Sequence, residues 1–215
     1  MPAPLPEPSP LPALSNGYVT FGSFNRAVKV QDPVLRCWAA ILRALPTARL
    51  VLKGYQIISQ SNQRDTVDAI MHAEGVDPER VTLLGQTDRA GHFGAYQGID
   101  IALDPFPHAG GMTTLDALWM GAPVVAVGGR TISSRLAVAS LTALDLTDFI
   151  AADSESYVQV AVAKARNLQA LADLRASLRS RVASSAVGDP QRYAQAVESA
   201  YREMWRRWCA DRKAP

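Results

Sequence analysis

A glycine loop between two short apolar runs constrains the fold of this chain more than any other segment. Residues 99–103 and 123–127 have the length and apolar character of buried strands. Between them, apolar residues at helical spacing predict a helix over 113–120, and Gly121 and Pro123 stand where such a helix should end. A strand, a loop, a helix and a second strand make a βαβ unit, and such units build parallel sheets.

The loop in this unit has the chemistry of an anion site. Gly110 and Gly111 let the backbone come close to a ligand, and Thr113 and Thr114 place hydroxyls beside the free N–H groups of the first helical turn. The helix dipole adds partial positive charge there, and the carboxylate of Asp116 could accept hydrogen bonds from a sugar. The spacing of Thr113 and Asp116 is also close to that of a structural capping box. The motif alone leaves both interpretations open.

The rest of the chain continues the alternation of strands and helices. Further strands are predicted at 18–24, 49–53 and 81–84, and no strand is predicted after Asp145. Helices are predicted at 32–45, 61–74, 87–96, 133–144, 153–168, 171–183 and from 189 onward. This order predicts the α/β class: a Rossmann-like, doubly wound parallel sheet with extra C-terminal helices.

Length and proline content suggest the domain organisation. At 215 residues the chain suits one large domain or two small ones, and its apolar content of 48% is ample for a core. Prolines at alternate positions from Pro2 to Pro12 predict an extended linker over 1–17 that lies outside the core. We expect a single Rossmann-like domain over 18–209 and a short tail at 210–215.

Charge and cysteine usage argue against several classes of function. A net charge of +2 is too small to indicate a nucleic acid or an anionic membrane as partner, and no apolar run is long enough to span a bilayer. Cys37 and Cys209 lie far apart in helical patterns, which favours a reduced, cytoplasmic location. The three histidines show no metal-ligand spacing, so we expect no bound metal.

Three polar segments are predicted at the carboxyl ends of strands, where ligands bind in doubly wound sheets. They are residues 25–29, 86–92 and 107–116. Lys29 brings an ammonium, His92 brings a flat ring, and the third segment brings N–H groups, hydroxyls and a carboxylate. A nucleoside diphosphate would use all three, through its charge, its base and its ribose.

Several of these segments also resemble a known protein family. Residues 18–29, 99–107, 110–123, 134–140 and 201–205 are similar to the C-terminal half of the O-linked N-acetylglucosamine transferases, in their bacterial SPINDLY-like branch. The likeness runs from about Tyr18 to Trp208. It implies the donor-binding half of a GT-B glycosyltransferase, in which two Rossmann-like halves enclose the active site.

The resemblance also implies roles for individual residues. Lys29 would contact the donor diphosphate and stabilise it as the leaving group, and His92 would pack near the base. Thr113 and Thr114 would bind phosphate, and Asp116 would bind the ribose. Further contacts to the nucleotide sugar are expected from Asn25, Arg26, Thr87, Gly110, Gly111 and Met112. The expected donor is UDP-N-acetylglucosamine or a related nucleotide sugar, the acceptor is a protein Ser or Thr, and no metal or other cofactor takes part.

Two hypotheses of different classes remain, because the family's N-terminal GT-B half and helical repeats are missing from this sequence. The chain is either the donor half of a protein O-glycosyltransferase or a nucleotide-binding module without catalysis of its own. A GT-B epimerase half is a weaker third possibility. The apolar stripe of Val197, Tyr201, Met204 and Trp208 is typical of a core helix, but in a fold of two halves it could cross to the other half and leave Trp205 and Trp208 exposed here.

Overall fold

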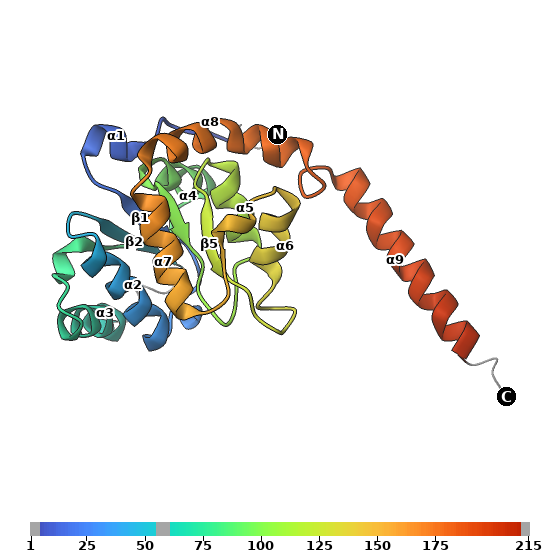
Figure 1. The fold of residues 1–215 in the computed structure, drawn as a ribbon, viewed down its shortest axis with the longest axis horizontal. Coiled ribbons are helices and arrows are strands. Elements are labelled where there is room, and N and C mark those ends of the chain that lie inside the picture. Colours follow the sequence, from blue (N-terminus) through green and yellow to red (C-terminus); the bar gives the residue numbers. More distant parts are fainter. Residues whose placement is uncertain (1–4, 55–60, 212–215) are drawn as a thin grey trace.

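In the residues that the computed structural model describes, 5–54 and 61–211, six strands form one parallel sheet (Figure 1). The strands are β1 (Thr20–Ser23), β2 (Arg49–Lys53), β3 (Val81–Leu84), β4 (Ile101–Leu103), β5 (Val124–Val127) and β6 (Ile150–Ala151). Their order is β3-β2-β1-β4-β5-β6, and the five neighbouring pairs are all parallel. The predicted doubly wound parallel sheet is confirmed.

Helices connect the strands and cover both faces of the sheet. They are α1 (Pro12–Asn16), α2 (Asp32–Ala44), α3 (Ser61–Ala73), α4 (Arg89–Ala95), α5 (Met112–Trp119), α6 (Leu136–Ala143), α7 (Ser154–Ala165), α8 (Leu168–Ser184) and α9 (Pro190–Asp211), with single turns at η1 (Ala27–Lys29), η2 (Pro78–Arg80), η3 (Tyr96–Gly98) and η4 (Thr147–Phe149). The chain moves from β1 to β3 in one direction and from β4 to β6 in the other. Right-handed crossovers then place the helices of the two halves on opposite faces. Helix α2 packs against α3 and α7, and α5 packs against α6 and α8.

The sixth strand corrects the prediction that no strand follows Asp145. Strand β6 has only two residues, Ile150 and Ala151, which pair with Ala126 and Val127 of β5. Two residues are too few to show the alternation by which a strand is recognised in a sequence. Its pairing is therefore decided by the neighbouring strand and not by a local pattern.

Side-chain caps set several helix boundaries. The carboxylate of Asp88 accepts a hydrogen bond from the Gly91 N–H and starts α4, as the sequence predicts. Asn167 caps α8 in the same way, so the helices predicted at 153–168 and 171–183 are separated slightly earlier, at 166–167. Helix α6 begins at Leu136 and not at 133, because the Ser134 hydroxyl bonds back to Thr131 and holds a turn there.

The N-terminal segment packs onto the domain, and the prediction of an extended linker is wrong for Pro12–Asn16, which forms α1. Leu11 and Ala13 are buried. The buried carboxylate of Asp100 accepts hydrogen bonds from the backbone N–H groups of Ala13 at 2.8 Å and Thr20 at 2.7 Å. The alternating prolines carried no sign of this tertiary contact. Residues 1–4 of the expected linker and 212–215 of the expected tail lie outside the described residues, and the domain boundaries stay a prediction.

A chain of buried polar contacts connects α2, α7 and the end of β4. Trp38 donates a hydrogen bond to the Tyr157 hydroxyl at 3.1 Å, and that hydroxyl donates to the backbone oxygen of Asp104 at 3.0 Å. Trp38 and Tyr157 are fully buried. Burial raises the pKa of Tyr157 well above its usual value, so its hydroxyl keeps its proton. These contacts fix the backbone at the point where β4 enters the glycine loop.

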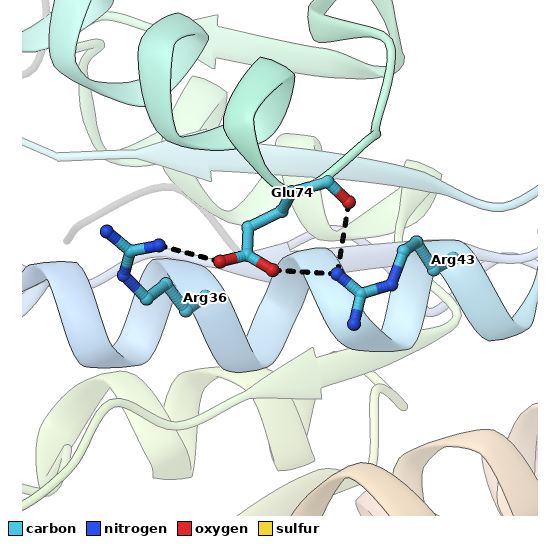
Figure 2. A network of polar contacts seen from close by, with 3 residues as sticks. All are labelled: Arg36, Arg43 and Glu74. Atoms are coloured by element: carbon cyan, nitrogen blue, oxygen red, sulfur yellow. Dashed lines mark hydrogen bonds and ion pairs between the residues drawn. The ribbon is translucent and has the colours of Figure 1, made fainter.

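On the opposite side of α2, a carboxylate joins this helix to the end of α3. Figure 2 shows Glu74 between two arginines of α2, with Arg36 and Arg43 each 2.7 Å from one of its carboxylate oxygens. Arg43 also donates a hydrogen bond to the Glu74 backbone oxygen at 3.0 Å. The hydrogen bond from Arg36, together with that from Arg43, lowers the pKa of Glu74. The network keeps α3 beside α2.

Helix α9 extends away from the body of the molecule (Figure 1). Its aromatic side chains are exposed, including Tyr201, Trp205 and Trp208, and the two tryptophan rings stack with their centroids 5.1 Å apart. In this chain the apolar stripe of α9 is therefore not part of the core. In the described part of the chain, no helix is long and apolar enough to cross a membrane.

Candidate functional site

A pocket of about 460 Å³ lies at the carboxyl ends of β1, β2 and β3 and at the start of α5. In doubly wound sheets ligands bind at this edge, near the point where the strand order reverses, which here lies between β1 and β4. The volume is in the range of small-molecule sites. Most of the predicted contact residues line it: Asn25, Arg26, Lys29, Thr87, His92, Gly111, Met112 and Thr113. The three predicted segments therefore meet at one site.

Direct hydrogen bonds join the loop after β1 to the glycine loop. The Thr113 hydroxyl donates to the Asn25 side-chain oxygen at 3.0 Å. The Lys29 ammonium donates to the Ala109 backbone oxygen at 2.8 Å. An ammonium has three N–H donors, so Lys29 can keep this bond and still contact a ligand. Burial lowers the pKa of Lys29, while the nearby carboxylate of Asp104 opposes the shift.

The carboxylate of Asp104 binds the backbone of the glycine loop. This residue was not among the predicted site residues. Its side chain is buried at the end of β4, and both carboxylate oxygens accept from the Gly110 N–H, at 2.8 and 3.0 Å. Burial raises the pKa of Asp104 to about 7, against the opposing effects of the Gly110 hydrogen bond and Lys29. The only sequence signal was an acidic residue directly after an apolar strand.

Gly110 has no room for a side chain. A Cβ atom there would lie 2.5 Å from Asp104 Oδ1 and 2.7 Å from the hydroxyl oxygens of Thr113 and Thr114. The loop therefore requires glycine at this position because neighbouring side chains fill the space. Gly111 is the N-cap of α5 and makes no side-chain cap bond. The capping-box interpretation of Thr113 and Asp116 is thus not realised, and the first N–H groups of α5 have no capping side chain.

Gly110, Thr114 and Asp116 do not line the pocket. Thr114 is 2% exposed, and its hydroxyl has no hydrogen-bond partner among the described residues. The Asp116 carboxylate lies 3.4 Å from His92 Nε2 and contacts the histidine that lines the pocket. The predicted contacts of Thr114 with phosphate and of Asp116 with ribose stay predictions.

The ring of His92 is held by aromatic neighbours. Its centroid lies 5.9 Å from that of Phe24, 5.6 Å from that of Tyr96 and 5.4 Å from that of Phe93. The Tyr96 hydroxyl in turn donates to the Thr113 backbone oxygen at 3.3 Å. The helix after β3 is therefore tied to the start of α5, and an imidazole faces the pocket between them.

Several pocket residues were not predicted. They are Phe24, Lys53, Gly54, Gln86, Asp88 and Arg89. The last three lie inside the segment 86–92 that was expected at the site. Lys53 ends β2 and Gly54 follows it, and the end of this strand was not among the predicted site segments. The sequence feature that could have identified Lys53 is its position as a lysine at the end of an otherwise apolar strand.

The described part of the chain contains no cluster of three histidine, cysteine or acidic side chains that could hold a metal ion. The expectation of a site without metal stays a prediction. The positive groups at the pocket are Lys29, Lys53, Arg26 and Arg89, together with the N-terminus of α5. Such an arrangement can bind an anion through side-chain cations and backbone donors.

The strand order and the pocket at the carboxyl edge define the class of this protein: a Rossmann-like domain of the type that forms the C-terminal half of GT-B glycosyltransferases. The sequence pattern of glycosyl transferase family 41 matches residues 11–197. The chain therefore belongs to glycosyl transferase family 41, and the expected family is confirmed.

Known proteins similar to this chain include plant enzymes. A probable UDP-N-acetylglucosamine–peptide N-acetylglucosaminyltransferase SPINDLY from Solanum lycopersicum is 40% identical over 210 residues, which are 96% of this chain and 22% of that protein. The protein of the same name from Arabidopsis thaliana is also 40% identical over 210 residues, 96% of this chain and 23% of its own length. This chain thus spans less than a quarter of these relatives.

A solved structure shares the fold closely. A mutant O-GlcNAc transferase from Thermobaculum terrenum is 34% identical and superposes with a TM-score of 0.86 over 98% of this chain, but only 40% of that protein is covered. A sucrose-phosphate synthase from Thermosynechococcus elongatus has a TM-score of 0.65 at 15% identity over 93% of this chain and 49% of its own, which shows a shared fold alone.

Proposed function

We propose that this chain is the donor-binding half of a protein O-glycosyltransferase and that its pocket binds UDP-N-acetylglucosamine or a related nucleotide sugar. One observation carries the proposal: Lys29, His92 and Thr113, from three separate segments of the chain, line a single pocket. The names of the plant relatives, which include UDP-N-acetylglucosamine and peptide N-acetylglucosaminyl transfer, support the choice of donor and acceptor.

The contribution of this half to catalysis would be electrostatic. When the bond between the sugar and the diphosphate breaks, negative charge develops on the β-phosphate. The Lys29 ammonium and the free N–H groups at the start of α5 offset that charge. The Lys29 ammonium is held by its bond to Ala109, and the start of α5 is held by the bond from the Thr113 hydroxyl to Asn25, so little reorganisation is needed when the charge appears. No metal ion would be required for this step.

The acceptor site would lie outside this chain. The relatives are several times longer, so the second Rossmann-like half and the helical repeats expected of the family would have to come from another part of a longer protein or from a partner. We expect this assembly to be cytoplasmic. Neither nucleic acid nor a membrane is expected as a partner.

A second candidate function is a nucleotide-binding module without catalysis of its own. The observation that favours it is the small share of the relatives that this chain covers. Both candidates require nucleotide binding, and they differ in whether transfer occurs when the missing half is supplied. If this chain transferred sugar by itself, it would not need the missing half, and the proposal of a non-catalytic nucleotide-binding module would also be wrong.

Titration with UDP, GDP and their sugars tests the proposal directly. In ¹H–¹⁵N spectra, the amide signals of the loops at 25–29 and 110–114 should shift together as nucleotide is added. Signals from α9, which extends away from the body of the molecule (Figure 1) and contributes no residue to the pocket lining, should stay in place. If none of these ligands shifts the loop signals at millimolar concentration, the proposed function is wrong.

A further inference from the structure

A buried lysine in the same pocket has no assigned role. Lys53 is the last residue of β2, and its side chain is 4% exposed. Its ammonium donates a hydrogen bond to the Gly85 backbone oxygen at 2.8 Å. Among the described residues no carboxylate forms an ion pair with it. Burial lowers its pKa, because an uncompensated buried charge is costly.

An ammonium has three N–H donors, and among the described residues the bond to Gly85 uses one of those of Lys53. The residue lines the pocket together with Gln86 and Thr87, the residues that follow β3. An unpaired buried cation facing a pocket is a ready donor to an acceptor oxygen of a bound ligand. The question is which part of a nucleotide sugar reaches it.

The strand order indicates which part of a bound nucleotide sugar lies near Lys53. A diphosphate held by Lys29 and the start of α5 would lie near the switch between β1 and β4. Neighbouring strands are about 4.8 Å apart, so the end of β2 is roughly 10 Å from the end of β4. Lys53 therefore lies on the β2–β3 side of the pocket, away from the diphosphate and beyond the end of β1. His92, the expected base contact, lies in the helix that follows β3, so the proposed function places the nucleoside on this side.

An ammonium only donates hydrogen bonds, so it favours a group that only accepts them. Uracil and guanine each present carbonyl oxygens that project from the ring. Adenine carries an amino donor where guanine has such an oxygen, and its acceptors are nitrogen atoms within the rings. Resting on the proposed function, we propose that Lys53 donates a hydrogen bond to a carbonyl oxygen of the nucleobase and thereby selects uracil or guanine nucleotides over adenine nucleotides.

Binding measurements with UDP, GDP and ADP on the wild type and on Lys53→Met test this inference. A hydrogen bond to a charged donor contributes enough that its loss should weaken UDP or GDP binding about tenfold or more, while ADP binding stays unchanged. The preference of the wild type should therefore disappear in the variant. As a control, Lys29→Met should weaken all three nucleotides by a similar factor, because they share the diphosphate.

The outcomes separate this inference from the proposed function. If UDP or GDP binds the wild type but Lys53→Met changes all three affinities equally, the role of Lys53 is wrong and the site stands. If no nucleotide binds the wild type, both are wrong. Methionine has a similar length and no charge, so the fold should tolerate it. If Lys53→Met does not fold, the nucleotide affinities of the wild type still test the inference, because equal affinities for ADP, UDP and GDP would overturn it.

Discussion

The ammonium of Lys29 donates a 2.8 Å hydrogen bond to the backbone oxygen of Ala109, which joins two loops 80 residues apart in the sequence. The bond places a cation directly beside the glycine loop and the uncapped start of α5. It also means that the cation is oriented before any ligand arrives. A pre-oriented cation loses little conformational freedom on binding, which favours affinity.

Removal of this cation should weaken nucleotide binding selectively. We expect Lys29→Ala to lower the affinity for UDP or its sugar by roughly 10- to 100-fold, because a charge-assisted contact to phosphate is lost. Isothermal titration calorimetry would measure the change. Lys164→Ala is a control with the same net charge, since Lys164 pairs with Asp148 outside the pocket. Equal affinities in the two variants would contradict the role of Lys29.

Substitution of Gly110 should disturb the loop itself. In Gly110→Ala the new Cβ would lie within 2.7 Å of three oxygen atoms, so the loop must shift. We expect a loss of about 1–3 kcal/mol in the free energy of unfolding, together with weaker nucleotide binding. Chemical denaturation gives the first value. Gly94→Ala, where a Cβ meets no atom within 4 Å, should be neutral or slightly stabilising. Equal free energies of unfolding for the two variants would show that the close contacts at Gly110 do not affect stability.

The buried carboxylate of Asp104 predicts a pH dependence of stability. Its pKa is raised from 3.8 in the unfolded chain to about 7 in the folded protein. Between these values the folded protein binds a proton that the unfolded chain does not, so stability falls as the pH rises from about 4 to about 7. Above pH 7 the contribution of Asp104 becomes constant.

Asp104→Asn isolates this effect from that of other carboxyl groups. An asparagine oxygen can still accept from the Gly110 N–H but cannot ionise. The difference in melting temperature between variant and wild type should therefore grow in favour of the variant as the pH rises from 4 to 7. A difference that is the same at all these pH values would show that Asp104 does not titrate in this range.

Asp100 should be essential for attachment of the N-terminal segment. Its carboxylate accepts from the N–H groups of both Ala13 and Thr20, and Asp100→Ala would leave two buried donors without partners. We expect a destabilisation of about 2–5 kcal/mol and faster amide exchange at Ala13. The exposed Asp148→Ala provides a matched control with the same charge change. Unchanged exchange at Ala13 would mean that α1 is held by apolar packing alone.

Chelation of metal ions should leave nucleotide binding unchanged. In our proposal, cationic side chains and the start of α5 offset the charge of the diphosphate. The affinity for UDP in excess EDTA should then equal that in excess Mg²⁺ within about twofold. A loss of binding in EDTA that Mg²⁺ restores would replace this account with a metal-assisted one.

The sequence alone predicted much of the architecture, for local physical reasons. Apolar runs marked β1 to β5, apolar residues at helical spacing marked α5, and the alternation of strands with helices implied a parallel sheet. The meeting of 25–29, 86–92 and 107–116 followed from that sheet, since parallel strands bring their carboxyl ends to one edge. Contacts between distant segments were not predictable in this way. The burial of Leu11 and Ala13, the two-residue β6 and the side chain of Lys53 in the pocket all depend on neighbours that no local pattern reveals.

The glycine loop shows most clearly which features the sequence predicted and which ones only the tertiary structure decided. From its glycines and threonines the sequence predicted a loop at the carboxyl end of β4 that offers backbone N–H groups and hydroxyls to a ligand. Only the tertiary structure decided that Thr113 faces the pocket and bonds to Asn25 while Thr114 is buried. The physical reason is helical geometry: successive residues are about 100° apart around the axis, and packing of α5 against its neighbours sets which direction is inward.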